Sequence, residues 1–333
     1  MRLAFLAIAL VFAADAVGQD AKCKLARIAE WSLRANSHLP ILDGEINGQK
    51  VGVLLDTGAS RSLIRRSATE QLRLPRRQAP GWQSYGVGGA SHVEIVVVDE
   101  FRIGKSARNN WRVIVMGEDR GDDWAVLLGD DFLSEADLEL DLRNNVVRIF
   151  QARDCAGVSL AYWSRQALEV RLEGDEKIEF SVAINGKPLR AQLDSGASYS
   201  LLENAAAEQR GVTSKSAGVK PAGCVTGFGV GGIDSWSGQF ESFAIGDEVI
   251  RNPRIQFADL WRHVTYTETG TRLRRQFAGL PQILLGVDFL RSHRVLVARS
   301  QKKMYFTYEG GTVFPEVITP ACNAPPLEKP KPS

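Results

Sequence analysis

Two aspartates lie in matching short motifs in the two halves of the chain. Asp56 stands in Asp-Thr-Gly-Ala-Ser and Asp194 stands in Asp-Ser-Gly-Ala-Ser, and each motif follows a hydrophobic run typical of a strand. A single carboxylate does little chemistry on a peptide bond, whereas two facing carboxylates that share a proton supply both a general base and a general acid. The repeated motif therefore predicts one catalytic site built from two halves of one chain.

The residues after each aspartate suit a tight turn at the end of a strand. Gly58 and Gly196 allow backbone amides to approach the carboxylate closely. The hydroxyls of Thr57 and Ser195 can hydrogen-bond across to the opposite half and lock the two loops together. We expect these four residues to support the active-site loops.

The repeat extends well beyond the aspartates, which indicates a duplicated domain. Ile46-Asn47-Gly48 recurs as Ile184-Asn185-Gly186, and the segment 126–133, which contains Leu-Leu-Gly, recurs as 283–290. The order of these motifs is preserved while their offset grows along the chain. We therefore expect loop insertions in the second copy, the largest around Trp261–Leu280.

A glycine-rich segment lies between strand signals in each half. Such a hairpin tip can move and lay its backbone over an extended ligand. Tyr85 either contacts substrate from the first segment or is an exposed hairpin aromatic, and both readings stay open. The segments predicted as substrate-binding flaps are Tyr85, Gly86, Val87, Gly88 and Gly89 in the first half and Phe228, Gly229, Val230, Gly231 and Gly232 in the second.

Strands are the dominant element predicted by the sequence, because β-branched and aromatic runs alternate with turn residues. Asn47-Gly48 and Asn185-Gly186 predict hairpin turns. Asp131 and Asp288 are interpreted as helix caps. The predicted strands are Val51–Leu55, Val93–Val98, Trp111–Val115, Val146–Phe150, Ile178–Ile184, Phe240–Ile245 and Val295–Val297, and the predicted short helices are Arg65–Leu72, Asp131–Ala136, Leu202–Arg210 and Asp288–Ser292.

Three motifs in order resemble a retropepsin-like aspartic protease, and here the order occurs twice. The motifs are Asp-Thr/Ser-Gly-Ala, a glycine-rich flap, and Leu-Leu-Gly before a short helix, over most of residues 40–150 and 178–308. The resemblance implies an all-β fold with two β-barrel lobes related by a pseudo-twofold axis and a few short helices. In the retroviral pattern a basic residue is common at the positions that Asp130 and Val287 occupy here. The resemblance therefore does not imply, for this chain, the salt bridge that the basic residue forms.

The resemblance also implies an aspartic endopeptidase that needs no metal and no cofactor. Asp56 and Asp194 match its catalytic pair, and Thr57 and Ser195 match its interlocking hydroxyls. Two carboxylates about 3 Å apart cannot both ionise, so they share one proton. A water between them would then attack the scissile carbonyl without a covalent intermediate.

Length and charge limit the classes of partner. A chain of 333 residues has room for two domains of ordinary size. A net charge of +2 is too small to favour nucleic acid or an anionic membrane surface. The expected partner is a peptide or protein substrate, and a monomer in which the two halves pair within the chain is favoured by their covalent link.

The N-terminal residues predict export. Arg2, an apolar core over Leu3–Ala14 and small residues up to Gly18 are typical of a signal peptide, with cleavage after Ala16 or Gly18. The run is too short to span a membrane, so no stable insertion is expected after signal removal. The protein is predicted to be periplasmic or secreted.

Four cysteines, an even number, favour two disulfides in an exported chain. Three pairings are possible. Cys23 and Cys155 bracket the first repeat, so we prefer Cys23–Cys155 together with Cys224–Cys322. The predicted domains are a signal peptide at 1–18, an N-terminal lobe at 24–155, a C-terminal lobe at 160–318 and a Pro-rich disordered tail at 319–333.

Two other functions stay open at the level of sequence. A catalytically silent protein of the same fold would bind peptides without cutting them. A nucleotide-binding enzyme of the actin or sugar-kinase type also uses two Asp-x-Gly loops, but the missing long helices and the Leu-Leu-Gly repeats oppose it. The natural substrate and the pH optimum do not follow from the sequence.

Overall fold

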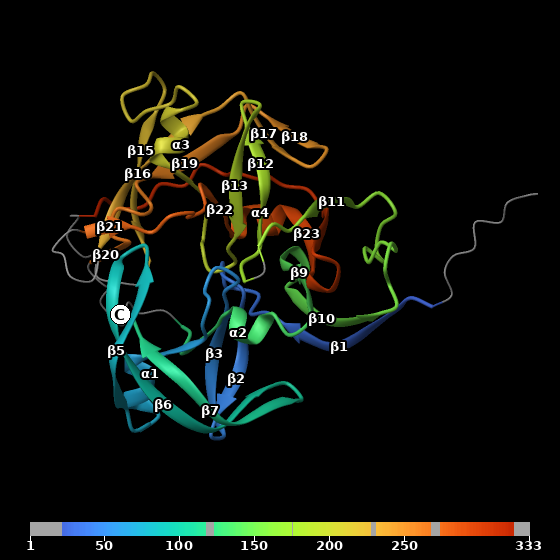
Figure 1. Ribbon diagram of the computed structural model, residues 1–333, viewed down its shortest axis with the longest axis vertical. Coiled ribbons are helices and arrows are strands. Elements are labelled where there is room, and N and C mark those ends of the chain that lie inside the picture. The colour runs from blue at the N-terminus through green and yellow to red at the C-terminus, as the bar shows by residue number, and fades with distance from the viewer. Residues whose placement is uncertain (1–21, 118–122, 175, 228–230, 268–273, 323–333) are drawn as a thin grey trace, which may run out of the picture.

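The computed structural model describes residues 22–117, 123–174, 176–227, 231–267 and 274–322, and strands make up most of this part of the chain. The predicted signal peptide at 1–18 and the flap residues Phe228, Gly229 and Val230 lie outside the described residues. Within those residues, no helix has the length and apolar character to cross a membrane. The mostly β structure confirms the predicted fold class (Figure 1).

The N-terminal lobe is a closed barrel of six strands. The strand order is β2-β3-β8-β4-β7-β6, and β2 pairs back onto β6 to close the ring. Inward-facing aliphatic side chains fill it; Val53, Val98 and Val115 are fully buried. A further strand, β5, pairs with β6 and carries the first flap at its end. The strands are β2 (Ile41–Ile46), β3 (Gln49–Leu55), β4 (Leu63–Arg65), β5 (Arg77–Gly86), β6 (Gly89–Ile103), β7 (Ser106–Met116) and β8 (Val126–Leu128).

The C-terminal lobe repeats this strand order. Its sheet runs β15-β16-β19-β14-β22-β13-β12-β17-β18, so that each strand of the first barrel has a counterpart. The counterpart of β6 is split into β16 and β17, and the strand predicted at Phe240–Ile245 therefore starts only at Ser242. The strands are β12 (Glu179–Ile184), β13 (Lys187–Leu193), β14 (Leu201–Glu203), β15 (Lys220–Thr226), β16 (Gly232–Gln239), β17 (Ser242–Ile245), β18 (Glu248–Arg251), β19 (Arg254–Ala258) and β22 (Ile283–Leu285).

Both predicted Asn-Gly hairpin turns are confirmed. Asn47 and Gly48 have φ of 50° and 76°, and Asn185 and Gly186 have φ of 51° and 71°. Two successive positive φ values define the turn type whose twist matches that of the flanking strands. These turns fix the register of β2 with β3 and of β12 with β13, the strands that lead to the two aspartates.

A six-stranded sheet joins the two lobes, with three strands from each half of the chain. Its order is β1-β10-β9-β23-β24-β11, and the halves meet where β9 pairs with β23. This sheet lies beside the two barrels in Figure 1. Its strands are β1 (Lys24–Ser32), β9 (Asp137–Asp141), β10 (Val146–Arg153), β11 (Leu168–Arg171), β23 (His293–Ala298) and β24 (Lys303–Tyr308).

The helices are short and fall at matching places in the two halves. One follows each aspartate loop, and one follows each Leu-Leu-Gly segment. The α-helices are α1 (Arg66–Gln71), α2 (Asp130–Leu133), α3 (Asn204–Glu208) and α4 (Val287–Ser292), and the 3-10 turns are η1 (Leu142–Asn144) and η2 (Arg299–Gln301).

The insertion expected around Trp261–Leu280 carries extra structure in the C-terminal lobe. Two strands, β20 (Thr265–Thr267) and β21 (Arg274–Gln276), pair with each other outside the barrel. In Figure 1 they lie beside the tip of the β5–β6 hairpin.

The two predicted disulfides are both present. Cys23–Cys155 links the start of β1 to the segment after β10, and Cys224–Cys322 links β15 to the C-terminal segment. The same segment is held by hydrogen bonds from Thr319 N to Ala222 O and from Cys224 N to Pro320 O, each 2.9 Å long. The disorder predicted to start at residue 319 is therefore not seen in residues 319–322, because β15 and the disulfide hold them.

Removing the Cys224–Cys322 bond is expected to lower stability substantially. The bond closes a loop of 98 residues, and the chain-entropy relation gives about 4–5 kcal/mol for a loop of that size. A Cys224→Ser, Cys322→Ser double variant should lose roughly this free energy of unfolding in urea titrations. Under reducing conditions the wild type should behave like a protein without disulfides, whereas an unchanged unfolding midpoint in the double variant would contradict the expectation.

Candidate active site

Each candidate catalytic aspartate lies at the end of a barrel strand. Asp56 follows β3 and its amide donates to Leu128 O at 2.9 Å, while Asp194 follows β13 and its amide donates to Leu285 O at 2.9 Å. The acceptors belong to β8 and β22, which pair in parallel with β3 and β13. The same strand pairing therefore positions both carboxyl groups.

Backbone amides hold each carboxylate in one orientation. In both loops the amides two and three residues further on donate to the Oδ1 atom. This arrangement fixes the carboxylate and leaves its second oxygen for other partners. The contacts are Gly58 N (2.8 Å) and Ala59 N (3.0 Å) to Asp56 Oδ1, and Gly196 N (3.0 Å) and Ala197 N (3.1 Å) to Asp194 Oδ1.

The two carboxyl groups face each other across the lobe interface. Each lies against the glycine of the opposite loop: a Cβ built on Gly58 would be 2.4 Å from Asp194 Cγ, and one built on Gly196 would be 2.4 Å from Asp56 Cγ. A hydrogen bond between the two carboxyl groups is among the influences on the pKa of both. Glycine is therefore required at both positions because no side chain fits in the space that the opposite carboxyl fills.

The predicted lock between the loops is present in both directions. Thr57 Oγ1 accepts from Ser195 N at 3.0 Å and donates to Leu193 O at 2.9 Å. Ser195 Oγ accepts from Thr57 N at 3.0 Å and donates to Leu55 O at 2.8 Å. Both side chains are buried, so four hydrogen bonds tie the lobes together directly beneath the carboxyl pair.

Thr57→Val is expected to lower the free energy of unfolding by about 2 kcal/mol, because it leaves the amide of Ser195 and the carbonyl of Leu193 buried without this partner. Thr57→Ser keeps the hydroxyl and is the matched control, since the C-terminal lobe uses serine at this place. Urea unfolding gives the free energy of unfolding of both variants. Equal stability of the valine and serine variants would show that the lock contributes little.

The Leu-Leu-Gly segments pack against the aspartate loops. A Cβ on Gly129 would lie 2.9 Å from Ala59 O, and one on Gly286 would lie 2.7 Å from Ala197 O. The residues after these glycines donate their amides to the same two carbonyls, at 2.8 Å and 2.9 Å. Each aspartate loop is thus supported from below by the segment that starts α2 or α4.

The interpretation of Asp131 and Asp288 as helix caps is wrong. Gly129 and Gly286 occupy the capping positions, and neither cap has a side-chain hydrogen bond. The two aspartates instead brace the aspartate loops, because each accepts from the hydroxyl and the amide of the serine six residues after Asp56 or Asp194. The contacts to Asp131 Oδ1 are from Ser62 Oγ (2.6 Å) and Ser62 N (2.7 Å), and those to Asp288 Oδ1 are from Ser200 Oγ (2.7 Å) and Ser200 N (2.9 Å).

Sequence reasoning missed these two serines, although both copies carry one at the same place after the aspartate. Their hydroxyls also accept from the amides of Gly129 and Gly286, at 3.1 Å and 3.0 Å. Burial raises the pKa of Asp288 to about 6, while the hydrogen bonds from Ser200 act in the opposite direction.

Asp130 stands at the position where the retropepsin resemblance predicts a basic residue, and its carboxylate pairs with a cation from elsewhere in the chain. Arg299, on η2 of the opposite half, forms an ion pair with the Asp130 carboxylate. Burial raises the pKa of Asp130, and the Arg299 charge opposes this shift. At the matching position of the C-terminal lobe, Val287 is fully buried and carries no charge.

Burial and mutual repulsion favour protonation of the central pair. Asp56 has 7% of its surface exposed, and burial followed by the charge of Asp194 raises its pKa to about 8. Burial also raises the pKa of Asp194. Since the two groups interact, they lose their protons as a pair, and both shifts favour a state in which the pair keeps a proton.

The tip of the first predicted flap lies against the C-terminal lobe. Gly88 O accepts from Gly231 N at 3.1 Å, so the two flap segments contact each other. Val87 packs against an apolar cluster that includes Leu201 and Leu284, neighbours of the Asp194 loop. Both Gly88 and Gly89 are buried at this contact.

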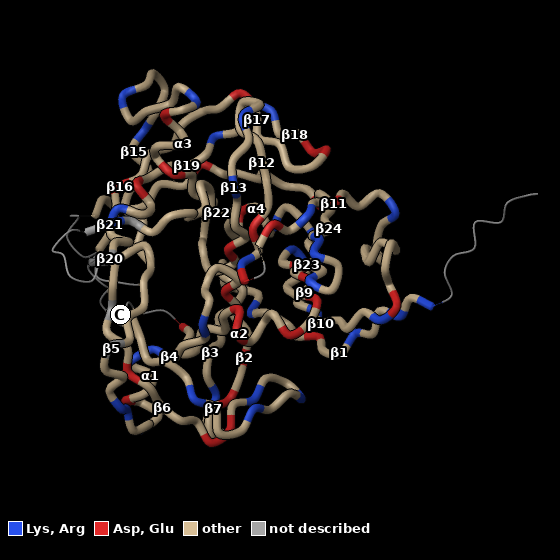
Figure 2. Tube along the Cα trace, in the orientation of Figure 1, with Lys and Arg blue, Asp and Glu red and all other residues tan. Residues whose placement is uncertain are grey.

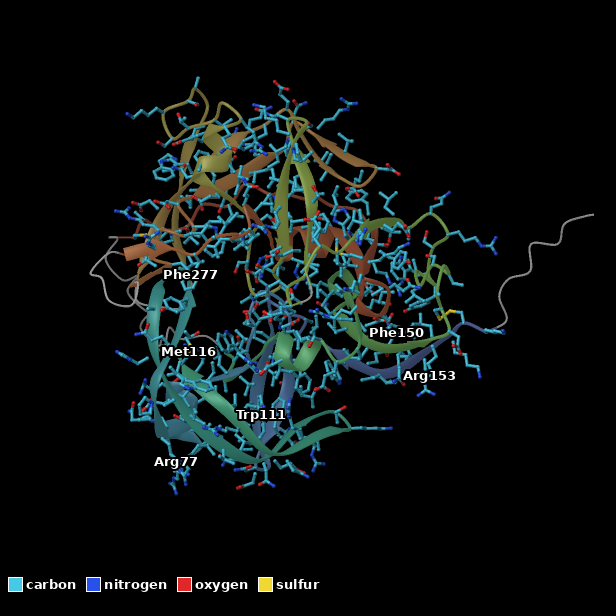
Figure 3. All side chains as sticks on the ribbon, viewed as in Figure 1. Arg77, Trp111, Met116, Phe150, Arg153 and Phe277 are labelled. Carbon is cyan, nitrogen blue, oxygen red and sulfur yellow. A yellow bond between two sulfur atoms is a disulfide. The ribbon has the colours of Figure 1, made fainter. Side chains whose placement is uncertain are left out.

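Tyr85 contacts the insertion rather than pointing only to solvent. Its ring packs edge-on against Phe277, with centroids 5.0 Å apart, and it is 37% exposed. Phe277 lies beside the tip of the β5–β6 hairpin in Figure 3. The insertion of the C-terminal lobe therefore extends the surface on which the first flap rests.

A third residue that the sequence did not reveal is Lys177, in the segment before β12. Its ammonium group donates to Gly58 O, in the loop that carries Asp56. The nearby amide of Gln192 donates to the same carbonyl at 3.1 Å.

Paired β lobes that each present one carboxylate at a shared interface define the structural class of the aspartic proteases. The chain matches the aspartyl protease family over residues 42–132 and 180–289, more than half of its length. The protein therefore belongs to the aspartyl protease family, and each matched region contains one aspartate motif. No curated protein is found to match the chain.

Proposed function

We propose that the protein is an aspartic endopeptidase that hydrolyses peptide bonds with a water activated between Asp56 and Asp194. The observation that carries this proposal is the pair of facing carboxyl groups, Asp56 buried and Asp194 partly exposed, each held by two backbone amides of its own loop. Their raised pKa values favour the form that holds one proton between them.

The one-proton state can carry out both halves of the reaction. The ionised carboxylate takes a proton from the water, whose oxygen attacks the scissile carbonyl carbon. The protonated carboxyl donates to the carbonyl oxygen, which gives a tetrahedral diol. The pair then gives its one proton to the amide nitrogen as the carbon–nitrogen bond breaks. The other carboxylate takes a proton from a diol hydroxyl, which becomes the carbonyl of the product acid, so the pair again holds one proton.

The flap segments offer a backbone to which a substrate can bind. The backbone of Gly86–Gly89 lies at the end of a two-stranded arm, where an extended peptide can pair with it as a further strand. We propose a peptide or protein substrate and a monomer whose two lobes form one site. The two disulfides fit an oxidising compartment, which supports export to the periplasm or the outside of the cell.

The test is cleavage of a peptide library by protein that lacks residues 1–18, from acid to neutral pH, with and without pepstatin. We expect cuts within peptides that pepstatin suppresses. Binding of peptides without cleavage at any pH would identify a silent peptide-binding protein instead. The two β barrels and the family match oppose the nucleotide-binding alternative.

A further inference from the structure

Lys177 brings a positive charge to the carboxyl pair from the C-terminal lobe. Its ammonium donates to the carbonyl of Gly58, the residue that lies against the Asp194 carboxylate. Because Gly58 also donates its amide to Asp56, this one residue touches both carboxyl groups and the cation. Lys177 therefore crosses from the C-terminal lobe to the loop of the N-terminal lobe.

The charges around Lys177 are mostly negative. The groups that act on its ammonium are Asp56, Asp194, Asp130 on α2 and Glu179 on β12. Glu176 and the cation of Arg299 act on Asp130 from the same region. Figure 2 shows acidic positions gathered in the middle of the molecule, between α4 and α2. Burial lowers the pKa of Lys177, and these acidic groups raise it and so favour its charged form.

The repeat has no counterpart of this cation in the other half. At the 138-residue offset of the two aspartate loops, Leu39 stands in place of Lys177 and Leu54 in place of Gln192. The hydrogen bonds within the two loops match. The Asp194 loop is instead reached from the N-terminal lobe by His38, whose Nε2 lies 2.8 Å from Ser198 O. The cation is therefore a difference between two sides that are alike in their backbone geometry.

We propose that Lys177 sets the charge of the carboxyl pair, by stabilising the state in which one of the two groups is ionised. This inference deepens the proposed function and rests on it. Burial alone favours a pair in which both groups are protonated, and such a pair lacks the base that activates water. A nearby positive charge opposes that effect and favours the ionised form. Lys177 acts through the pair and is a positioning residue.

The proposal predicts that both proton losses of the pair occur at lower pH with Lys177 than without it. Lys177→Met should move both titration midpoints up by about one pH unit, the size expected for a unit charge a few Å away in a partly buried site. Lys177→Arg, which keeps the charge, should restore midpoints close to those of the wild type.

The titration is measured directly, by NMR of the protein labelled with ¹³C at aspartate carboxyl groups. Signals of the pair are assigned with Asp56→Asn and Asp194→Asn. Lys50→Met is the matched control: it removes an equal charge from the exposed end of β3, about 20 Å along the strand from Asp56. We expect it to leave both midpoints in place.

The structural contact is separated from the charge by Lys177→Gln, which can still donate to Gly58 O. If this variant shows the same upward shift of both midpoints, loss of charge is responsible, and this result does not depend on how well the methionine variant folds. Midpoints that stay at their wild-type values in both variants would overturn it.

Activity gives an independent readout. Both limbs of the pH profile of kcat/KM should move upward in Lys177→Met by the same amount as the NMR midpoints. If the wild type cleaves no peptide, the proposed function fails, and the NMR titration still decides whether Lys177 sets the charge of the pair.

Discussion

Replacing either Asp56 or Asp194 by asparagine is expected to reduce peptide cleavage by about 10³–10⁴-fold or more. An amide can neither take the proton of the water nor donate one to the carbonyl in the required cycle. Since each lobe supplies one member of the pair, either single change should be sufficient. The measurement is kcat/KM on a peptide that the wild type cuts.

Thermal stability distinguishes a variant that has lost only its catalytic group from a variant that has also lost its folded structure. The pKa of Asp56 in the folded protein, about 8, lies above its ordinary value of 3.8, so the folded state binds this proton more tightly than the unfolded state does. The wild type is therefore most stable with respect to this group below about pH 4, and it loses that stability as the pH rises toward 8. An asparagine side chain cannot ionise, so the Asp56→Asn variant should unfold at an equal or higher temperature at pH 7.

Two outcomes would contradict this picture of one shared site. Substantial cleavage by a single variant would mean that each lobe forms its own site with a second chain. A variant that is inactive and also much less stable at pH 7 would mean that the carboxyl pair holds the lobes together rather than straining them.

Gly196→Ala is expected to remove most of the activity through a single added carbon. Its Cβ would lie 2.4 Å from both Cγ and Oδ2 of Asp56, a distance at which one of the groups must move. A displacement of about 1 Å at a reacting group costs roughly 100-fold in rate, and overpacking costs about 1–3 kcal/mol of stability. Both kcat/KM and urea unfolding should change in the same variant.

Gly58 is the residue related to Gly196 by the pseudo-twofold axis, so the same substitution there provides a comparison. Gly58→Ala places its Cβ 2.4 Å from Asp194 Cγ and should have a similar effect. Ala197→Ser adds one atom in the same loop and should keep activity within about tenfold of the wild type. If Gly196→Ala retained full activity, the close approach of the carboxyl to the opposite loop would not be required for catalysis.

The parts of the site that sequence could predict are encoded by residues close together in the chain. The aspartate loops follow from Asp-Thr/Ser-Gly after an apolar strand, and the Asn-Gly turns set the register of the strands before them. The cross-lobe hydroxyl lock followed because Thr57 and Ser195 recur at one position and each has a hydroxyl to donate.

What sequence could not predict depends on residues that are far apart. Asp131 lies 69 residues after Ser62, and an aspartate early in a short helix suggests a cap unless that distant partner is known. Lys177 stood in a polar segment without a motif, and its role depends on a carbonyl 119 residues earlier. The pairing of β9 with β23 likewise joins two ordinary strands, and nothing in either strand identifies the other.

The six-stranded sheet, with three strands from each half of the chain, affects which amino-acid substitutions the protein can accumulate. In an assembly of two identical chains, every substitution appears on both sides of the site, and dilution separates the sides. In this protein the two lobes belong to one chain, so dilution does not separate them. Each half of the gene can also acquire substitutions independently of the other. A lysine in one half at the position where the other half has a leucine is a difference that two identical chains cannot have.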